Sequence, residues 1–446
     1  MQLLRLPAEL DADAAERAIL AHLPGPGPLL RLEVPLHTAD PAAWLQARAG
    51  AEPLAWLARD DGLHLCGHGV AARLAGATEG MAGGFHDLNQ RLADAPPRTR
   101  WFAALTFAPG QRDATWQDLP DWQFLLPQWE IGRDRDGAWL ALHTDGRQPV
   151  ALPRRTVPDA APRLRTLRQT PDFAHWTQLF RRAQAAFSTE ELRKVVLARR
   201  TDLTFEQALD PVALWSRLAA QEPGTFRFLL PARPGASFLG ASPERVLHLD
   251  GPHVRIEALA GTAARGRTET EDAQRRAALA ASPKDAVEHE IVRAWLVAAL
   301  TGLGCTVAPE TPRETRLFRR VMHLFTPIQA ELPAGSSAGI AALLQAIFPS
   351  PALCGAPRGP AHALLQRHEP FARGLYCGAV GLVHAGGCEL AAGLRSALVR
   401  EDGVVSAFAG AGIVAASDCA EEWRELDAKT SAVLGAAGAE PGQEAA

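Results

Sequence analysis

Residues 225–261 read TFRFLLPARPGASFLGASPERVLHLDGPHVRIEALAG, and this stretch indicates the fold more clearly than any other. Four runs of mostly apolar residues follow one another here, separated by short turns that contain glycine and proline: 225–230, 236–243, 244–251 and 253–261. The stretch therefore predicts four consecutive strands.

The same alternation of strands and helices continues on both sides of this stretch. Apolar residues at helical spacing predict helices over 171–192, 210–221, 282–303 and 418–436. Apolar runs bounded by glycine predict further strands over 194–205, 375–387, 388–401 and 404–414. Long antiparallel strands with helices set to one side are typical of an α+β domain, which we expect to cover residues 166–435.

The rest of the chain is less regular. Residues 1–150 mix tryptophan-rich, strand-like pieces with short helices and contain no cluster of catalytic residue types. Residues 147–172 are rich in proline and arginine and are expected to form a connector. We expect residues 436–446 to be a disordered tail.

Composition excludes several classes of protein. The 446 residues are 47% hydrophobic and 22% charged, and a net charge of −4 gives no electrostatic footprint for nucleic acid or a membrane surface. The six cysteines include no CxxC pair, which argues against a zinc site or a disulfide framework and for a reducing compartment. The charged N-terminus does not resemble a signal peptide, and no apolar stretch reaches 18 residues. We therefore expect a cytoplasmic protein with neither a nucleic-acid nor a membrane partner.

Lysine is unusually scarce. Of 46 lysine and arginine residues only Lys194, Lys284 and Lys429 are lysines. A guanidinium keeps its proton in a protein, whereas a lysine in a poorly hydrated pocket can lose it. The three lysines are therefore the first candidates for chemistry that needs a compact or deprotonatable amine.

Two predicted helices carry acidic faces. Asp285 and Glu288 are three residues apart, and Glu422, Glu425 and Lys429 are spaced to share one face. If the two faces are opposed, their carboxylates offer the oxygen ligands that Mg²⁺ prefers together with an anionic substrate. The alternative is that both are solvent-exposed helix faces, as charged faces usually are.

Lys194 begins a predicted strand among apolar neighbours, so its side chain is expected to face a core or a pocket. Burial favours the neutral form of a lysine, which would let Lys194 act as a general base, although a lysine at the strand edge with its amine in solvent fits equally well. The glycine-rich turns GASPERV, LAGTAARG and AFAGAGIV could seat a small anion or could be ordinary turns, and none matches a nucleotide-binding fingerprint.

Taken together and in order, these segments resemble the chorismate-utilising enzymes, which include isochorismate, anthranilate, aminodeoxychorismate and salicylate synthases. The similar segments, between about residues 190 and 430, are KVVLARR, FLGASPERVL, ALAGTAARG, SPKDAVEHEIV, VMHLFTPI, HEPFARGLYCGAVG, LRSALV, AGAGIV and EEWRELDAK. The resemblance implies a single large α+β unit in which two long antiparallel sheets pack together with helices outside. Residues 1–165 would then contribute strands to that common fold.

The resemblance also implies roles for particular residues. Glu288 and Glu425 would bind Mg²⁺, with Asp285 and Glu422 supporting the metal through water. The residues expected around chorismate are Gly261 and Thr262 at the ring carboxylate, Tyr376, Arg395 and Gly410 at the enolpyruvyl carboxylate, His323 near the ring, and Lys429 beside the metal carboxylates.

The attacking group follows from the same resemblance. Enzymes of this family that use water carry a lysine at the position of Lys194, whereas those that use ammonia carry glutamine. Aminodeoxychorismate enzymes also need a nucleophilic lysine where this chain has Ala260. The resemblance therefore implies that Lys194 deprotonates a water that attacks ring C2, while Glu244 protonates the departing C4 hydroxyl.

The expected product is isochorismate. Enzymes that continue to salicylate tend to carry threonine at the position of Ala352, and alanine there matches the isochorismate synthases. The alternatives are a salicylate synthase, an amination subunit that needs a glutaminase, and a non-catalytic binding protein. We expect a monomer that needs Mg²⁺ but no glutaminase subunit, and the sequence does not choose among menaquinone, siderophore and salicylate-derived pathways. Cys354 and Phe325 depart from the family pattern and could alter the pocket.

Overall fold

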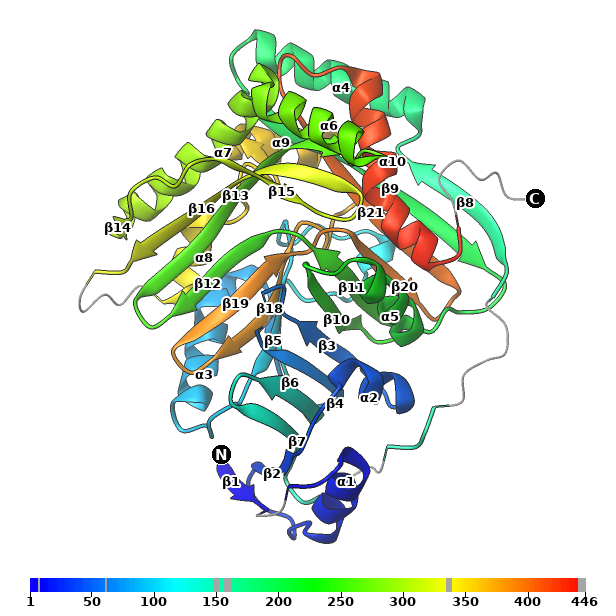
Figure 1. Ribbon diagram of the computed structural model, residues 1–446, viewed down its shortest axis with the longest axis vertical. Coiled ribbons are helices and arrows are strands. Elements are labelled where there is room, and N and C mark those ends of the chain that lie inside the picture. Colours follow the sequence, from blue (N-terminus) through cyan, green and yellow to red (C-terminus); the bar gives the residue numbers. More distant parts are fainter. Residues whose placement is uncertain (7–8, 61, 148–151, 156–161, 334–338, 440–446) are drawn as a thin grey trace.

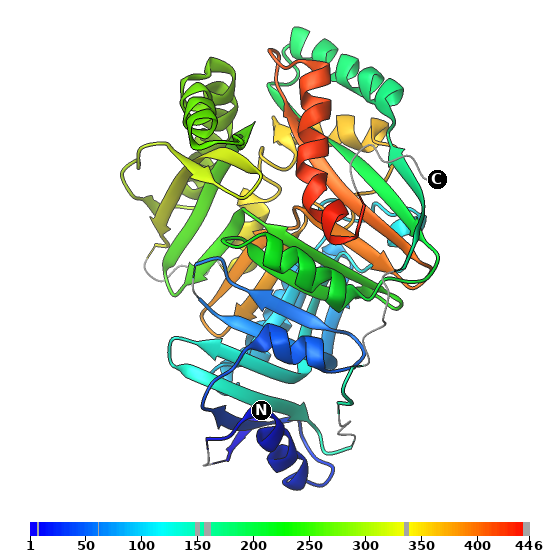
Figure 2. The ribbon, with the colours of Figure 1, turned by 45° about the vertical axis from the view of Figure 1, so that its right-hand side comes forward.

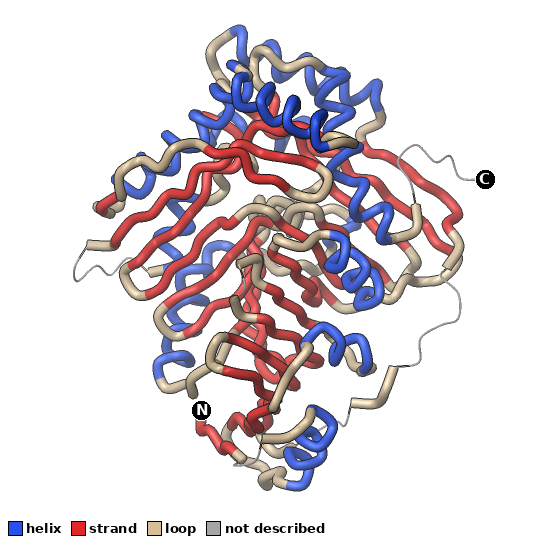
Figure 3. The backbone as a smooth tube through the Cα atoms, viewed as in Figure 1, coloured by secondary structure: helices blue, strands red, loops and turns tan. Residues whose placement is uncertain are grey.

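The computed structural model describes residues 1–446 except 7–8, 61, 148–151, 156–161, 334–338 and 440–446. Its described strands are joined by hydrogen bonds into one sheet of 21 strands (Figure 1). The described strand pairs are antiparallel, except β1 and β2, which run parallel. Helices surround the sheet on the outside (Figure 3). The predicted α+β class with long antiparallel strands is confirmed.

The lower part of the molecule in Figure 1 forms the base of the sheet, which we call the stem. Its strands lie in the order β1, β2, β7, β6 and β4. They are β1 (Gln2–Arg5), β2 (Leu30–Leu36), β7 (Gly137–Thr144), β6 (Trp122–Asp134) and β4 (His64–Gly76).

The sheet divides into two arms at β4 and β6. The first arm begins with β3, which pairs with β4 on one side and with β10 on the other. In the order in which they pair, the strands of the first arm are β3 (Leu54–Leu57), β10 (Phe226–Arg233), β11 (Ala236–Ser242), β20 (Ser396–Arg400), β21 (Val404–Ile413) and β9 (Lys194–Phe205), with β8 (Leu164–Thr170) and β17 (Gly355–Ala356) both on β9.

The second arm begins with β5, which pairs with the first residues of β6, while β7 pairs with the last. Its strands are β5 (Trp101–Leu105), β18 (Ala379–His384), β19 (Gly387–Ala392), β12 (Arg245–Asp250), β13 (His253–Ala264) and β16 (Val321–Glu331), with β14 (Thr306–Val307) and β15 (Glu314–Leu317) on β16. The two sheets expected from the sequence are therefore two arms that share the strands of the stem.

The helices cover the arms. In the turned view, α6 and α7 lie over the second arm and α4 and α10 over the first (Figure 2). The helices are α1 (Ala12–Ala21), α2 (Pro41–Ala47), α3 (Met81–Ala93), α4 (Phe173–Ser188), α5 (Pro211–Gln221), α6 (Glu269–Ala281), α7 (Pro283–Gly302), α8 (Ile340–Ile347), α9 (Arg358–His368) and α10 (Cys419–Ala436), with short 3₁₀ turns at Thr78–Gly80 and Ala114–Trp116. None of the described helices has both the length and the apolar character needed to span a bilayer.

The apolar core has two large parts. One contains residues of both arms, and in it the ring of Trp116 contacts the rings of Phe238 and Phe408. The other joins the stem and the first arm to α5 and the end of α10, with Trp215 and Trp129 fully buried. Burial of this kind stabilises by about 25 cal/mol per Å² of apolar surface, so the arms are held by packing as well as by hydrogen bonds.

Three regions differ from the sequence predictions. The expected connector contains β8, whose Leu164 and Leu167 face the core while its arginines remain outside. Helices α6, α8 and α9 were not predicted; α6 begins with a capping pair in which the Thr268 hydroxyl accepts from the Glu271 amide. The predicted tail is packed as far as Ala439, which is 2% exposed, and its residues 440–446 lie outside the described chain.

Two very short connections carry the chain from one arm to the other. Pro243 and Glu244 join β11 of the first arm to β12 of the second, and residues 393–395 join β19 of the second arm to β20 of the first. Arg395 adopts a left-handed backbone conformation in this turn, with φ 45°. The side chains of Glu244 and Arg395 are therefore placed where the arms meet.

Candidate active site

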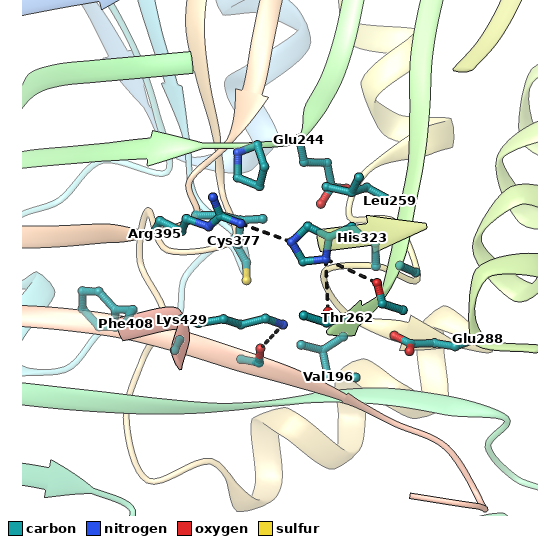
Figure 4. Close-up of a pocket in the computed structure, with 18 of the residues that line it drawn as sticks. Val196, Glu244, Leu259, Thr262, Glu288, His323, Cys377, Arg395, Phe408 and Lys429 are labelled. Atoms are coloured by element: carbon teal, nitrogen blue, oxygen red, sulfur yellow. Dashed lines mark hydrogen bonds between the residues drawn. The ribbon is translucent and has the colours of Figure 1, made fainter. Parts of the chain in front are cut away.

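One cavity lies between the arms (Figure 4). All the predicted catalytic and substrate-binding residues line it, as does Glu288: Lys194, Glu244, Gly261, Thr262, Glu288, His323, Ala352, Tyr376, Arg395, Gly410 and Lys429. Asp285, Glu422 and Glu425 do not line this cavity, although Asp285 lies against Gly261 and Glu425 is bonded to Lys429.

Lys194 lies at the start of β9 with a side chain only 1% exposed. Its Nζ is 2.9 Å from Oε1 of Glu288 on α7. Gly412 on β21 makes this contact possible, because a Cβ at that position would lie 2.3 Å from the same Glu288 oxygen and 3.1 Å from Cε of Lys194. The amine is therefore enclosed between the two arms and does not reach solvent.

Glu244 lies across the cavity from this pair. Figure 4 shows Glu244 beside Leu259 on one side, with Val196, Glu288 and Lys429 on the other. Glu244 is 5% exposed, and burial, opposed by the charge of Lys194, raises the pKa of its carboxyl to about 8. The carboxyl is therefore protonated at neutral pH and can donate a proton.

Arg395 and His323 form a second polar group in the cavity. Nη2 of Arg395 lies 3.2 Å from Nε2 of His323, whose Nδ1 is 3.1 Å from Oγ1 of Thr262 and 3.3 Å from the carbonyl of Gly261. Since a guanidinium only donates, Nε2 accepts and Nδ1 carries the hydrogen. Burial and the charge of Arg395 lower the pKa of His323 well below its usual value, so the ring is neutral.

The guanidinium of Arg395 is poorly compensated. It is 8% exposed, and Glu222, its one carboxylate partner among the described residues, is 3.6 Å away. Burial lowers the pKa of Arg395 to about 10, and the nearby charge of Glu222 offsets only part of this effect. A buried cation with such a distant partner is suited to receive an anionic group of a ligand.

Tyr376 and Gly410 form the adjoining wall. The ring of Tyr376 stacks on Phe408 at 5.3 Å between centroids. A Cβ at Gly410 would lie 2.6 Å from the Tyr376 hydroxyl, so glycine is required for that hydroxyl to reach the β21 backbone. The carbonyl of Gly410 accepts a hydrogen bond of 3.0 Å from Nζ of Lys429.

The acidic helices α7 and α10 carry their carboxylates near their N-terminal ends. Ser282 caps α7 and Asp418 caps α10, and acidic side chains are favourable near such ends. Each lysine of the chain bonds one of these carboxylates: Lys194 bonds Glu288, Lys284 bonds Glu422 at 2.7 Å, and Lys429 bonds Glu425 at 2.6 Å. The lysines singled out by their scarcity therefore gather at one place.

The charges of these carboxylates are unevenly balanced. Burial alone would raise the pKa of Glu288, but the positive charges of Lys194, Lys429 and Lys284 outweigh it and lower that pKa. Burial and the neighbouring charge of Glu425 raise the pKa of Glu422 to about 7. Burial, with a further contribution from Glu288, also raises the pKa of Asp285.

These carboxylates have donor atoms that suit a divalent cation, but they are not arranged around one point. Within the described chain no three histidine, cysteine, aspartate or glutamate side chains converge as a ready metal site. The carboxylates nevertheless offer oxygen donors only, which is the donor set that Mg²⁺ prefers. Burial, and then the charges of Glu425 and Glu288, raise the pKa values of Glu422 and Asp285, and a hard dication would offset both effects.

The sequence alone did not identify several residues of the cavity. They are Val196, Pro243, Leu259, Cys377, Leu394, Phe408, Ala409 and Gly412. Most are apolar and have no signal beyond their neighbourhood, but the glycine alternation of AGAGIV could have indicated Gly412. Phe325 is not in the lining; its ring lies under the guanidinium of Arg316 at 3.8 Å. Cys354 is fully buried and is not in the lining either.

Comparison with known proteins gives a consistent result. Residues 21–438 match the family model described as "Chorismate binding enzyme". The chloroplastic isochorismate synthase of Catharanthus roseus is 29% identical over 358 residues, which are 75% of this chain and 61% of that protein. Isochorismate synthase EntC of Escherichia coli K12 is 36% identical over 265 residues, 59% of this chain and 67% of that protein.

Solved structures give the same match. The structure of MenF, the menaquinone-specific isochorismate synthase from Escherichia coli, superposes with a TM-score of 0.81 at 26% identity and covers 95% of this chain and 99% of that one. Against the isochorismate synthases of Catharanthus roseus and Arabidopsis thaliana, the matched part spans only 61% and 42% of the relatives' length.

Proposed function

The chain belongs to the family of chorismate binding enzymes, and from that premise we propose that it is an isochorismate synthase that isomerises chorismate with Mg²⁺. The observation that carries the proposal is the placement of Lys194 and Glu244 in one enclosed cavity, the amine bonded to Glu288 and the protonated carboxyl on the opposite side.

Substrate recognition rests on cations in the cavity. Chorismate carries two carboxylates, and Arg395 is a buried guanidinium whose carboxylate partner, Glu222, is 3.6 Å away. We assign the enolpyruvyl carboxylate to Arg395, Tyr376 and the backbone near Gly410, and the ring carboxylate to the side of Gly261 and Thr262. Val196, Leu259 and Phe408 supply apolar walls for the ring.

The reaction exchanges one hydroxyl for another. Lys194 accepts a proton from a water whose oxygen bonds to ring C2, the ring double bonds shift, and the C4–O bond breaks. Glu244 gives its proton to the departing hydroxyl, so that water leaves and the net change is isomerisation. The base gains a proton and the acid loses one, and exchange with solvent restores both.

Mg²⁺ would be held by Glu288 and Glu425, supported through water by Asp285 and Glu422, and when bound it supplies a positive charge for the ring carboxylate. The protein side of this arrangement is Glu288, which holds the buried amine of Lys194 at 2.9 Å and would also bind the metal.

The nature of the nucleophile and the product also follows from residues in the cavity. Lys194, Ala260 and Ala352 all line it. Alanine at 260 offers no amine for a covalent intermediate, and a lysine at 194 favours water over ammonia. We therefore propose a single-chain enzyme that needs no glutaminase subunit, with salicylate synthase as the alternative that shares the same pocket.

The test is direct. Purified protein is incubated with chorismate, with and without Mg²⁺, and the products are separated by chromatography while pyruvate is measured in parallel. Isochorismate is expected only with Mg²⁺ and without stoichiometric pyruvate. Salicylate with pyruvate, or anthranilate after addition of ammonium, would overturn the assignment.

A further inference from the structure

A second group of charged residues lies directly behind Glu244. Glu244 belongs to the two-residue connection between β11 and β12, and the carbonyl of its neighbour Pro243 accepts a 2.9 Å hydrogen bond from Nη1 of Arg59. Arg59 follows β3 in the stretch before residue 165, which the sequence had not linked to chemistry. Its side chain is 4% exposed, so this contact is sealed from solvent.

Glu257 completes the contact from the second arm. This residue of β13 is 3% exposed and accepts from both terminal nitrogens of Arg59, at 2.9 and 2.5 Å. It also accepts from the backbone amide of Arg245 at 3.2 Å and from Nη1 of Arg245 at 3.0 Å. The peptide units on both sides of Glu244 are therefore held by one buried arginine–glutamate–arginine group, which we call the clamp (Arg59, Glu257 and Arg245).

The clamp fixes the backbone and leaves the carboxyl of Glu244 free. The carbonyl of Glu244 accepts from the Ala392 amide at 3.0 Å, and its own amide lies 3.3 Å from the Ser242 hydroxyl. The side chain lines the cavity instead. Bidentate arginine–carboxylate pairs fix direction as well as distance, so the clamp fixes the backbone from which the carboxyl extends into the cavity.

The charges around Glu244 come from several elements. Lys194 on β9 and Lys429 on α10 lower the pKa of Glu244, whereas the negative charge of Glu257 raises it beyond the effect of burial. Glu288, His323 and Arg395 also line the cavity. Glu257 does not line the cavity, yet its negative charge raises the pKa of Glu244.

We infer that Arg59 and Glu257 are positioning residues for the reaction: through the clamp they hold the backbone of Glu244 so that its carboxyl faces the cavity opposite Lys194. The charge of Glu257 adds to the effect of burial in opposing ionisation of that carboxyl. The inference rests on the proposed function, because it assigns Glu244 the role of the acid. The N-terminal region is then part of the catalytic apparatus.

The experiment measures kcat as a function of pH and follows its alkaline limb, which is the fall of kcat at high pH. Glu257→Gln keeps the shape of the side chain and removes its charge, so the midpoint of this limb should move to lower pH by roughly half a unit. Arg59→Lys keeps the charge but cannot bond Pro243 and both oxygens of Glu257 at once. It should lower kcat about tenfold, with KM within about twofold and the limb unmoved.

Glu389→Gln is the matched control. Glu389 also pairs with Arg245, at 2.7 Å, but on the side away from Glu257, and its charge is not among those that shift Glu244. Its limb should stay at the wild-type position. The inference would be overturned if the alkaline limb of kcat had the same midpoint pH in Glu257→Gln and Glu389→Gln. An unchanged kcat in Arg59→Lys would also overturn it.

Infrared titration separates this result from failure of the proposed function. The band of the protonated carboxyl, identified by its loss in Glu244→Gln, reports the protonation of Glu244 without any turnover. Its midpoint should fall in Glu257→Gln even if the substrate had been assigned incorrectly. An unmoved midpoint would contradict the role of Glu257 whatever reaction the enzyme catalyses.

Discussion

Lys194 is enclosed by the two arms, and one carboxylate, Glu288, holds its amine. Replacing it with alanine removes the proposed base, while Glu288 keeps the compensating charges of Lys429 and Lys284. We expect Lys194→Ala to lower kcat by at least about 10³-fold with little change in melting temperature. Arg193→Ala, at the exposed neighbouring position, is the control and should keep wild-type turnover. Near-normal activity of Lys194→Ala would exclude water activation by this amine.

Glu244 gives a prediction about pH. An acid must be protonated to act, so kcat should fall as pH rises through about 8, the pKa to which burial raises Glu244. The folded pKa also exceeds the usual value of 4.5, so the folded state binds the extra proton between these values and loses stability as pH rises toward 8. Glu244→Gln should be inactive, yet its melting temperature relative to wild type should increase from pH 6 to pH 9. A constant difference would indicate an ordinary, solvated carboxyl.

The acidic helices carry the metal prediction. Glu288→Gln should raise the Mg²⁺ concentration for half-maximal activity by at least about tenfold and weaken chorismate binding with it, because an amide is a poorer ligand for a hard cation. Calorimetric titration with Mg²⁺ measures the first effect. Glu290→Gln on the same helix, where Glu290 pairs with Arg293 at the surface, serves as the control. Unchanged metal dependence in Glu288→Gln would remove Glu288 from the ligand set.

Strand β21 contributes backbone where side chains would obstruct the site. In Gly412→Ala the new Cβ would lie 2.3 Å from Oε1 of Glu288, so the carboxylate and the Lys194 amine must both move. We expect kcat/KM to fall by about 10²-fold, as for other misplacements of this size. Gly359→Ala on α9 meets no atom within 4 Å and should leave activity unchanged. A fully active Gly412→Ala would show that the Lys194–Glu288 contact is dispensable.

Individual elements were largely legible from the sequence, because strand and helix periodicity is local. Residues 194–205 form β9 as predicted, and residues 404–414 contain β21. Segments with weaker apolar patterns could not be predicted. Burial of β8 depends on its pairing with β9, and α6 is polar along most of its length. The ion pairs of Lys194 and Lys284 could not be predicted either, because their partners are distant in the sequence; Lys284 and Glu422, for example, are 138 residues apart.

At the scale of the whole molecule, the arms depend on strands contributed by the first 165 residues. β5 pairs with β18, joining Trp101 to Val383, and β3 pairs with β10. No local pattern encodes such distant pairings, which is why the resemblance and not the periodicity indicated that this region joins the common fold. It is also why Arg59, beside Pro243 in space, carried no signal in the sequence.

This dependence predicts cooperative unfolding. Without β3 and β5 the edges of β10 and β18 would be unpaired, so the first 165 residues should not unfold separately. Tryptophan fluorescence reports mainly this region, which holds Trp44, Trp56, Trp101, Trp116, Trp122, Trp129 and Trp139. Its midpoint in urea should coincide with that of far-ultraviolet circular dichroism. Two separated midpoints would show that the N-terminal region is an independent domain.

The gathering of all three lysines around one set of carboxylates has a practical consequence for handling the protein. Reagents that acylate amines, such as those used for dye conjugation or for immobilisation on a resin, have the N-terminal amine and these three side chains as targets. Lys284 and Lys429 are 28% and 21% exposed, so among the side chains these reagents would modify the amines on the acidic helices. Attachment through an appended tag would spare them.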